Sequence, residues 1–369
     1  MLVCKKIHCA AVFLFIIAAA SALICTACQA QPEVSFAELA GTKDIAEIGT
    51  EENTIDNNSK QEQAMQGILP QPVFINTKNT YQTLNVATYI TKIDDLYFIA
   101  DCYHNQILYH NILGDPLTEW QVLTDKVHYA HTIAADEEVL LVDDTENNRV
   151  LVFQNINGQY AQTQTLENIG LKPHYIQYDA QRNVFMVWSS ITGEMYFLKR
   201  ADTPDDMGIF PIYIEKILKI EELYGVYVRS FTIMEDGIYF VSGHNNQKII
   251  KAKISPDGNA FTIKASYAVP DKIAGMVQLT KIDEYYYITV STDNQENQEY
   301  ATIVRCKDLE ALEQGSYQDI YRSFGISGGT PYYITQIEGR YYMAHHRTNE
   351  NIIAFDIIDN EIRNVKVIY

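Results

Sequence analysis

The main part of this 369-residue chain has almost no cysteine. Four of the six cysteines lie within the first 28 residues, which leaves only Cys102 and Cys306 beyond them. Two thiols are too few for a disulfide framework or a cysteine-based zinc site. Positive charge is also scarce, since 28 Lys and Arg stand against 47 Asp and Glu, a formal net charge of −19. Such a chain repels phosphate backbones, so we expect no nucleic-acid partner.

Familiar catalytic and nucleotide-binding motifs are missing as well. The sequence contains no G-x-S-x-G nucleophile motif, no phosphate-binding P-loop and no dinucleotide fingerprint. We therefore expect no cofactor, and the sequence does not state a reaction.

The N-terminal residues 1–28 have the layout of a secretory signal peptide. Lys5 and Lys6 precede an uncharged run over residues 10–24, which is shorter than the roughly 20 residues that a membrane span prefers. The following residues resemble a bacterial lipobox, and this resemblance implies that Cys28 is lipidated. We expect an extracytoplasmic protein held on the cell membrane by this lipid alone. Plain secretion after cleavage behind Ala30, or an uncleaved anchor, are the alternatives.

Residues 29–69 are predicted to form a disordered acidic linker. They contain eight acidic residues, two lysines and no aromatic residue after Phe36. Such a segment cannot bury enough apolar area to offset the entropy lost on ordering. Pro70 then marks the start of a folded domain over residues 70–369.

A strand–turn–strand unit recurs along this domain. Its clearest copy spans residues 142–153, VDDTENNRVLVF, where two apolar strands flank a polar turn. Alternation of apolar and polar residues with period two dominates, which is typical of strands. Each copy is preceded by one more strand and followed by another. Further copies lie at residues 99–110, 187–198 and 241–252, with looser copies at 288–304 and 343–355.

Six four-stranded units at spacings of 43 to 54 residues predict an all-β fold. We expect a six-bladed β-propeller with four-stranded antiparallel blades, because one blade leaves both faces apolar and stacking around an axis buries them. The 26 tyrosines suit this packing, since the ring lies between blades while the hydroxyl reaches a turn or water. The alternative is seven blades, with residues 73–83 as the remnant of another.

The turn in residues 142–153 resembles the core of the NHL repeat. The matching residues are Asp144, Asn147, Arg149, Val150 and Phe153, with Asp101, Asn105 and Ile107 in the first blade. The resemblance implies a propeller from a broad group that includes receptor and scaffold modules, lactonases and lyases. It therefore leaves the function open.

The innermost strand of each blade lines the central channel of a propeller, so polar residues there are candidates for a site. Two interpretations of these residues remain open. His131, His174, Arg229 and Tyr332 are catalytic candidates, because Arg neutralises a carboxylate while His and Tyr move a proton. The other interpretation is polar packing in a wet channel. The aligned inner positions are Thr88, His131, His174, Ser230, Val277 and Tyr332, with Arg229 beside Ser230.

A second set of residues is predicted to contact a ligand without catalysing a reaction. These binding candidates are Thr88, Ser230, Trp188 and His345. We expect no functional metal, because the inner positions lack the acidic and amide ligands that calcium-dependent lactonase propellers present at their axis.

The favoured functional hypothesis is a monomeric cell-surface lipoprotein with a non-catalytic binding or scaffold propeller that recognises a protein or a glycan outside the cell. The alternative is an extracytoplasmic hydrolase or polysaccharide lyase that uses the His, Arg and Tyr residues of the channel.

Overall fold

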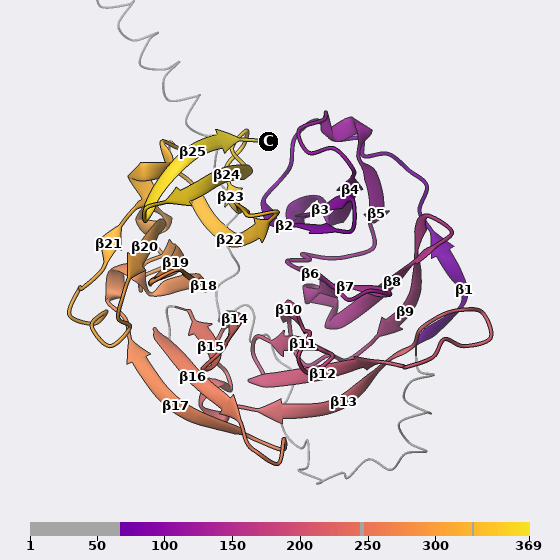
Figure 1. The fold of residues 1–369 in the computed structure, drawn as a ribbon, viewed down its shortest axis with the longest axis horizontal. Helices are drawn as coiled ribbons and strands as arrows, with labels where there is room; N and C mark the ends of the chain where they lie inside the picture. Colours follow the sequence, from indigo (N-terminus) through magenta and orange to yellow (C-terminus); the bar gives the residue numbers. More distant parts are fainter. Residues whose placement is uncertain (1–66, 244–246, 327) are drawn as a thin grey trace, which may run out of the picture. The chain divides into compact units, whose positions relative to one another are not determined.

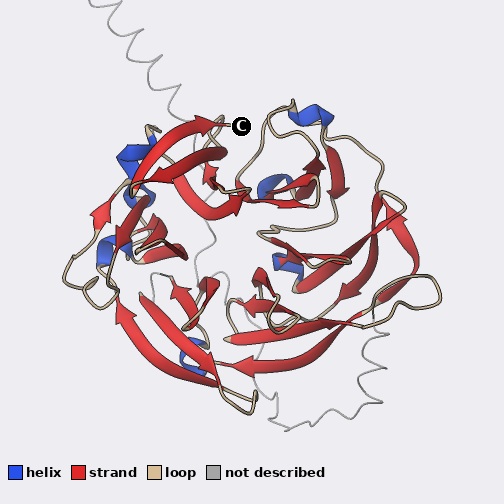
Figure 2. Cartoon of the chain, in the orientation of Figure 1, coloured by secondary structure: helices blue, strands red, loops and turns tan. Residues whose placement is uncertain are grey.

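The computed structural model describes residues 67–243, 247–326 and 328–369. The predicted signal sequence, with the lipidation site Cys28, and nearly all of the predicted linker lie outside these residues. The described part forms six antiparallel sheets around a common centre, so the predicted six-bladed β-propeller is confirmed (Figure 1, Figure 2).

Each blade is a meander whose strands follow one another in chain order. Its first strand lies nearest the centre (Figure 1). The first three blades comprise β2 (Ala87–Ile93), β3 (Leu96–Asp101), β4 (Gln106–His110) and β5 (Gln121–Thr124); β6 (Ile133–Ala135), β7 (Val139–Asp144), β8 (Arg149–Ile156) and β9 (Gln159–Leu166); and β10 (Pro173–Asp179), β11 (Val184–Ser189), β12 (Glu194–Arg200) and β13 (Ile212–Lys219).

The remaining three blades have the same order. They comprise β14 (Val228–Met234), β15 (Gly237–Ser242), β16 (Lys248–Ile254) and β17 (Phe261–Ala268); β18 (Gly275–Ile282), β19 (Tyr285–Thr292), β20 (Thr302–Cys306) and β21 (Gln318–Asp319); and β22 (Thr330–Ile337), β23 (Arg340–His346), β24 (Ile352–Ile358) and β25 (Glu361–Val367). Short 3₁₀ helices lie in the connections: η1 (Cys102–His104), η2 (Leu117–Glu119), η3 (Thr145–Asn147), η4 (Glu221–Leu223), η6 (Asp271–Ile273), η7 (Gln298–Tyr300) and η8 (Tyr321–Phe324). Within the described residues, no helix has the length and apolar character needed to cross a membrane.

One further strand decides the number of blades. Strand β1 (Ile68–Phe74) pairs antiparallel with β9 and becomes the fifth, outermost strand of the second blade. Residues 73–83 are therefore not the remnant of a seventh blade. Strand β1 also begins slightly before Pro70, the residue at which we predict the domain to start.

Aromatic side chains fill the space between adjacent blades. Trp188 of the third blade packs on Phe240 of the fourth at a ring-centroid distance of 4.7 Å, and both side chains are fully buried. Phe98 of the first blade meets the edge of Tyr160 in the second at 5.4 Å. Burial of such rings stabilises the fold by roughly 25 cal/mol for each Å² of apolar surface removed from water.

A buried carboxylate holds the polar turn of the clearest repeat. Asp144 is fully buried and accepts hydrogen bonds from the backbone N–H of His128 at 2.6 Å, from Asn147 Nδ2 at 2.9 Å and from Arg149 Nε at 2.7 Å. These three donors surround the Asp144 carboxylate and hold the turn in place, so the motif residues have a structural role.

The first blade repeats this turn 43 residues earlier. Asp101 accepts the N–H of Asn85 at 2.7 Å, as Asp144 accepts that of His128. Asn105 Oδ1 accepts the N–H of Tyr129, and Asn148 Oδ1 accepts the N–H of Lys172 in the same way. Both asparagines end a 3₁₀ turn in the left-handed region, with φ of 56° and 53°. The equivalent of Asn105 is therefore Asn148, not Asn147 as the motif comparison suggests.

Tyr369 joins the sixth blade to the first. Its backbone oxygen accepts the N–H of Asn351 at 2.6 Å. Its hydroxyl accepts the indole N–H of Trp120 at 3.0 Å and the N–H of Gly114 at 2.8 Å, and donates to the carbonyl of Asp115 at 2.9 Å. The backbone of Tyr369 is thus bonded to the sixth blade, and its hydroxyl is bonded to the first blade.

We expect Tyr369→Phe to lower the free energy of unfolding by about 1–3 kcal/mol, because the buried Trp120 N–H loses its acceptor. Urea denaturation followed by tryptophan fluorescence measures the change. Tyr224→Phe is the matched control, because Tyr224 is 48% exposed. Equal urea midpoints for the two variants would show that the hydroxyl does not stabilise the junction.

Candidate functional site

Four residues from four different blades meet at the centre of the propeller. His131 directly precedes β6, His174 lies on β10, Arg229 on β14 and Tyr332 on β22. These are the four catalytic candidates predicted from the sequence, and they converge because each lies on or beside the innermost strand of its blade (Figure 1).

Four aromatic rings form a row across this centre. The imidazoles of His131 and His174 stack with centroids 3.9 Å apart. Tyr332 stacks on His131 at 5.6 Å and on His346 at 4.6 Å, and each of these pairs is inclined by 21° or less. The row contains His346, which the sequence analysis did not select.

The hydrogen bonds along this row indicate which nitrogens of His174 and His131 carry a proton. His174 Nδ1 lies 3.0 Å from the carbonyl oxygen of Arg229, which only accepts, so Nδ1 carries the proton. His174 Nε2 then accepts from the Tyr332 hydroxyl at 3.5 Å. The same hydroxyl lies 3.3 Å from His131 Nδ1 and accepts its N–H. His131 Nε2 is thereby left with a free lone pair.

Electrostatics keep these imidazoles neutral. Burial, and then the charges of His174 and Arg229, hold the pKa of His131 well below its usual 6.5. Burial lowers the pKa of His174 to about 3, and the Arg229 charge adds to this. Burial also lowers the pKa of His346. At neutral pH the three imidazoles of the row are therefore uncharged.

Arg229 supplies the positive charge of the site. The side chain is 4% exposed, donates to the Ser291 hydroxyl and lies over the ring of Tyr227 at 5.4 Å. These contacts hold a guanidinium beside the imidazole row, where an anionic group of a ligand would find its counter-charge.

Tyr333 also positions the row. Tyr333 is fully buried and donates to the Arg229 carbonyl at 3.0 Å, beside His174 Nδ1 at 3.1 Å. Neighbouring residues on a regular strand face opposite sides. Strand β22, however, shifts register between Pro331 and Ile334. This shift lets the adjacent Tyr332 and Tyr333 both contact His174.

Asp143 fixes the backbone that carries His131. Its carboxylate accepts the N–H of His131 at 2.9 Å and the hydroxyls of Thr132 and Thr145, each at 2.8 Å. Burial raises the pKa of Asp143 to about 7, although all of these donors lower it. The bonds hold His131 at the start of β6, so Asp143 is a positioning residue.

The four predicted binding residues do not line an open surface. Thr88 donates to the His131 carbonyl at 3.0 Å, and Ser230 donates to the Val277 carbonyl at 2.7 Å, so both hydroxyls connect neighbouring blades. Trp188, another predicted binding residue, is fully buried against Phe240.

His345 is the fourth predicted binding residue. It is fully buried, its Nδ1 donates to the Glu350 carbonyl at 2.8 Å, and its Nε2 lies 3.0 Å from the Tyr321 hydroxyl. Since adjacent strand residues face opposite sides, His346 and not His345 joins the row at the centre. Within the described residues, no group of three His, Cys, Asp or Glu side chains is arranged to hold a metal ion.

No family model and no curated protein matches this chain. Solved structures do match it. One is a proposed 6-phosphogluconolactonase from Bacteroides fragilis, with 9% identity, a TM-score of 0.55, and coverage of 79% of this chain and 91% of that one. Another is a proposed 6-phosphogluconolactonase from Bacteroides uniformis, with 10% identity, a TM-score of 0.53, and coverage of 76% and 84%. At these identities the likeness establishes the propeller fold.

These two structures contradict the favoured functional hypothesis. A non-catalytic binding or scaffold propeller was expected because the sequence has no catalytic motif, yet both similar propellers are named for an enzymatic activity. A propeller site is assembled from one or two residues of each blade. A contiguous motif is therefore not needed, and its absence is weak evidence against catalysis.

Proposed function

We propose that the centre of the propeller is a catalytic site that hydrolyses a lactone carrying an anionic group. The observation that supports this most is the Tyr332 hydroxyl between two neutral imidazoles, 3.3 Å from His131 Nδ1 and 3.5 Å from His174 Nε2. These distances are long for hydrogen bonds between a hydroxyl and an imidazole, as is common for catalytic groups without a bound substrate. The activity for which the two similar structures are named suggests the lactone.

His131 is the general base in this proposal. His131 is partly exposed whereas His174 is fully buried, and His131 Nε2 takes no part in the hydrogen bonds of the row, so we assign the base to this nitrogen. The nitrogen takes a proton from this water as the water oxygen attacks the lactone carbonyl carbon. When the ring C–O bond breaks, the imidazolium returns the proton to the leaving oxygen. The product is a hydroxy carboxylate, and its carboxyl proton passes to solvent.

Tyr332 and His174 support His131 through the hydrogen bonds of the row. His174 is fixed by the Arg229 carbonyl and orients the Tyr332 hydroxyl, which accepts from His131 Nδ1. This acceptor stabilises the imidazolium that forms during attack, as the third member of a catalytic triad does. Tyr332 and His174 are therefore positioning residues.

Two cations favour an anionic substrate. The charges of Arg229 and Lys172 both lower the pKa of His131, which shows that a positive potential reaches the base. Lys172 is 9% exposed and bonds Glu146, whereas Arg229 contacts Ser291 and Tyr227. Arg229 is thus placed to attract a phosphate or carboxylate of the substrate and the oxyanion of the intermediate.

The pH dependence of lactone hydrolysis tests the proposal. Because the pKa of His131 lies well below 6.5, the base stays neutral under mildly acidic conditions. We expect kcat/KM to be the same at neutral pH and at pH 6.5, and to decline only at pH values below 6.5. The measurement uses gluconolactone and its 6-phosphate in weakly acidic buffer, where spontaneous opening is slow. No turnover of either lactone, or a decline centred at or above pH 6.5, would contradict the proposal.

We also propose that this enzyme works outside the cell, anchored through lipid on Cys28. The support is the sequence pattern of residues 1–28. Cys28→Ser is expected to remove the acyl mass and to release the protein from the membrane fraction. Fractionation and intact mass spectrometry measure both effects. An unchanged membrane fraction without an acyl adduct on the parent protein would disprove lipidation.

We further propose that the blades are NHL-like repeats. The support is the equivalence of Asp101 with Asp144 and of Asn105 with Asn148, whose hydrogen bonds span the same numbers of residues in two blades.

A further inference from the structure

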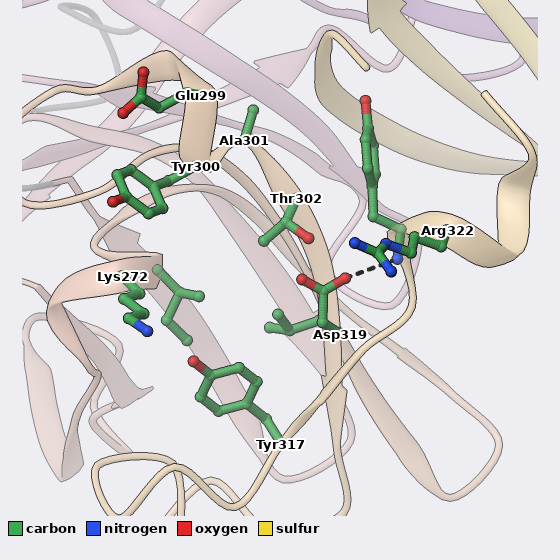
Figure 3. A pocket seen from close by; sticks show the side chains of 11 residues that line it. Lys272, Glu299, Tyr300, Ala301, Thr302, Tyr317, Asp319 and Arg322 are labelled. Atoms are coloured by element: carbon green, nitrogen blue, oxygen red, sulfur yellow. Dashed lines mark hydrogen bonds between the residues drawn. The ribbon is translucent and has the colours of Figure 1, made fainter. Parts of the chain in front are cut away.

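The fifth blade carries a cavity of about 470 Å³ that is separate from the central row of rings. Residues of η6, η7 and η8 surround it, together with residues of β20 (Figure 3). Its volume falls in the range of roughly 300–1,000 Å³ that is common for small-molecule sites. We call it the outer cavity.

The outer cavity exists because the last strand of this blade is short. Strand β21 has two residues, whereas the fourth strands of the other blades have between four and eight. Asp319 and Gln318 pair with Val304 and Arg305, and the chain then turns into η8. Thr302, at the start of β20, therefore has no outer strand beside it, and the hollow takes the place of that strand.

The wall of the outer cavity combines apolar, aromatic and polar groups. Ile273 and Val304 are buried apolar residues, and Tyr300 presents a ring that is 43% exposed. Tyr317 adds a second aromatic ring. Thr302 is 8% exposed, and its Oγ1 atom is buried without a hydrogen-bond partner. A buried hydroxyl with no partner is costly, so this group favours a ligand with a polar atom at that place.

Charged side chains of both signs complete the lining. Lys272 and Arg322 are cationic, Glu299 and Asp319 are anionic, and all four are exposed. Lys272 and Arg322 lie on opposite sides of the hollow (Figure 3). Among the described residues, no ion pair joins any of the four to another. Asp319 Oδ1 accepts the backbone N–H of Tyr321 at 3.0 Å, which leaves its second oxygen for a ligand (Figure 3). The two positive and two negative charges balance, so the lining favours neither an anion nor a cation, and an apolar ligand would leave the Thr302 hydroxyl unsatisfied.

We propose that the outer cavity binds a neutral sugar, a hexose or a disaccharide. Each sugar hydroxyl both donates and accepts, so one ligand satisfies Lys272, Asp319 and the Thr302 hydroxyl together. The C–H face of the ring lies against Tyr300, where it removes apolar surface from water. This site is additional to the catalytic centre and does not depend on the proposed reaction.

Isothermal titration calorimetry of the full-length protein tests this site. Maltose, cellobiose and lactose are the probes, and glucuronate and inorganic phosphate are the anionic comparisons. We expect saturable binding of at least one neutral sugar with a dissociation constant of about 1 mM, the weak end of specific recognition. Tyr300→Ala is expected to weaken this binding at least tenfold, and Thr302→Val to weaken it severalfold while Thr302→Ser restores it.

Tyr224→Ala is the matched control, since Tyr224 is similarly exposed but lies at the end of η4, in a different blade. It is expected to bind sugar as the parent does, and His131→Ala is expected to do so as well, which separates the outer cavity from the centre. Absence of saturation by all three neutral sugars would overturn the proposal. Preferential binding of glucuronate or phosphate, or equal affinity in Tyr300→Ala, would also overturn it.

Discussion

Replacement of His131 by alanine is expected to lower kcat/KM for lactone hydrolysis by about 10²–10⁴-fold, the usual contribution of a positioned general base. The reason is that His131 combines a neutral imidazole, partial exposure and an Nε2 lone pair that takes no part in the hydrogen bonds of the row. Steady-state rates on gluconolactone 6-phosphate measure the effect. Circular dichroism is expected to show an unchanged fold, because the carboxylate of Asp143 bonds the backbone N–H at this position and not the imidazole.

His128→Ala is the control for this experiment. His128 is an exposed histidine three residues away, and its backbone makes its hydrogen bonds: the N–H donates to Asp144 and the carbonyl accepts from the N–H of Glu146. Its replacement is expected to leave the rate within twofold of the parent. If His131→Ala kept most of the activity, the base would have to be another group, and the proposed mechanism would be wrong.

The blades could be predicted from the sequence because each repeats the same local chemistry. Alternating apolar residues determine the strands, and the polar turn recurs with Asp101 and Asp144 in equivalent positions. Strand β1 could not be assigned this way, because its place in the second blade depends on pairing with β9, far along the chain. Local pattern does not specify such a partner.

The site could be predicted in part. Alignment of the inner strands correctly brought His131, His174 and Tyr332 together. It missed His346, because the choice between His345 and His346 depends on which face of β23 points to the centre. It also missed Tyr333, which contacts His174 only because β22 shifts register there.

The hypothesis of a non-catalytic propeller was wrong because it rested on the absence of contiguous catalytic motifs. Four blades each contribute a residue on or beside their innermost strand, so His131 and Tyr332 lie about 200 positions apart although their side chains are 3.3 Å apart at the closest polar atoms. Such residues come together only when the six blades close into a propeller around one axis. The same applies to the outer cavity, which arises from the shortness of β21 and not from any motif.

Replacement of Asp144 by alanine is expected to destabilise the propeller by about 3 kcal/mol, since each buried donor left without an acceptor costs about 1–3 kcal/mol. The N–H of His128 and the Arg149 guanidinium both lose their partner. Glu167 lies 3.5 Å from Arg149 and offsets part of the second loss. Urea denaturation and thermal melting measure the change.

A graded set of variants distinguishes the loss of the Asp144 hydrogen bonds from the general effect of removing a negative charge. Asp144→Asn retains the size of the side chain and one acceptor oxygen, so its urea midpoint is expected to lie between those of the parent and Asp144→Ala. Asp202→Ala removes a carboxylate from an exposed loop and is expected to change stability by less than about 0.5 kcal/mol. Because Asp143, the next residue, holds the backbone of His131, Asp144→Ala is also expected to lower the rate of lactone hydrolysis below its melting temperature. Equal midpoints for Asp144→Ala and Asp202→Ala would mean that the repeated carboxylate does not hold the blade together.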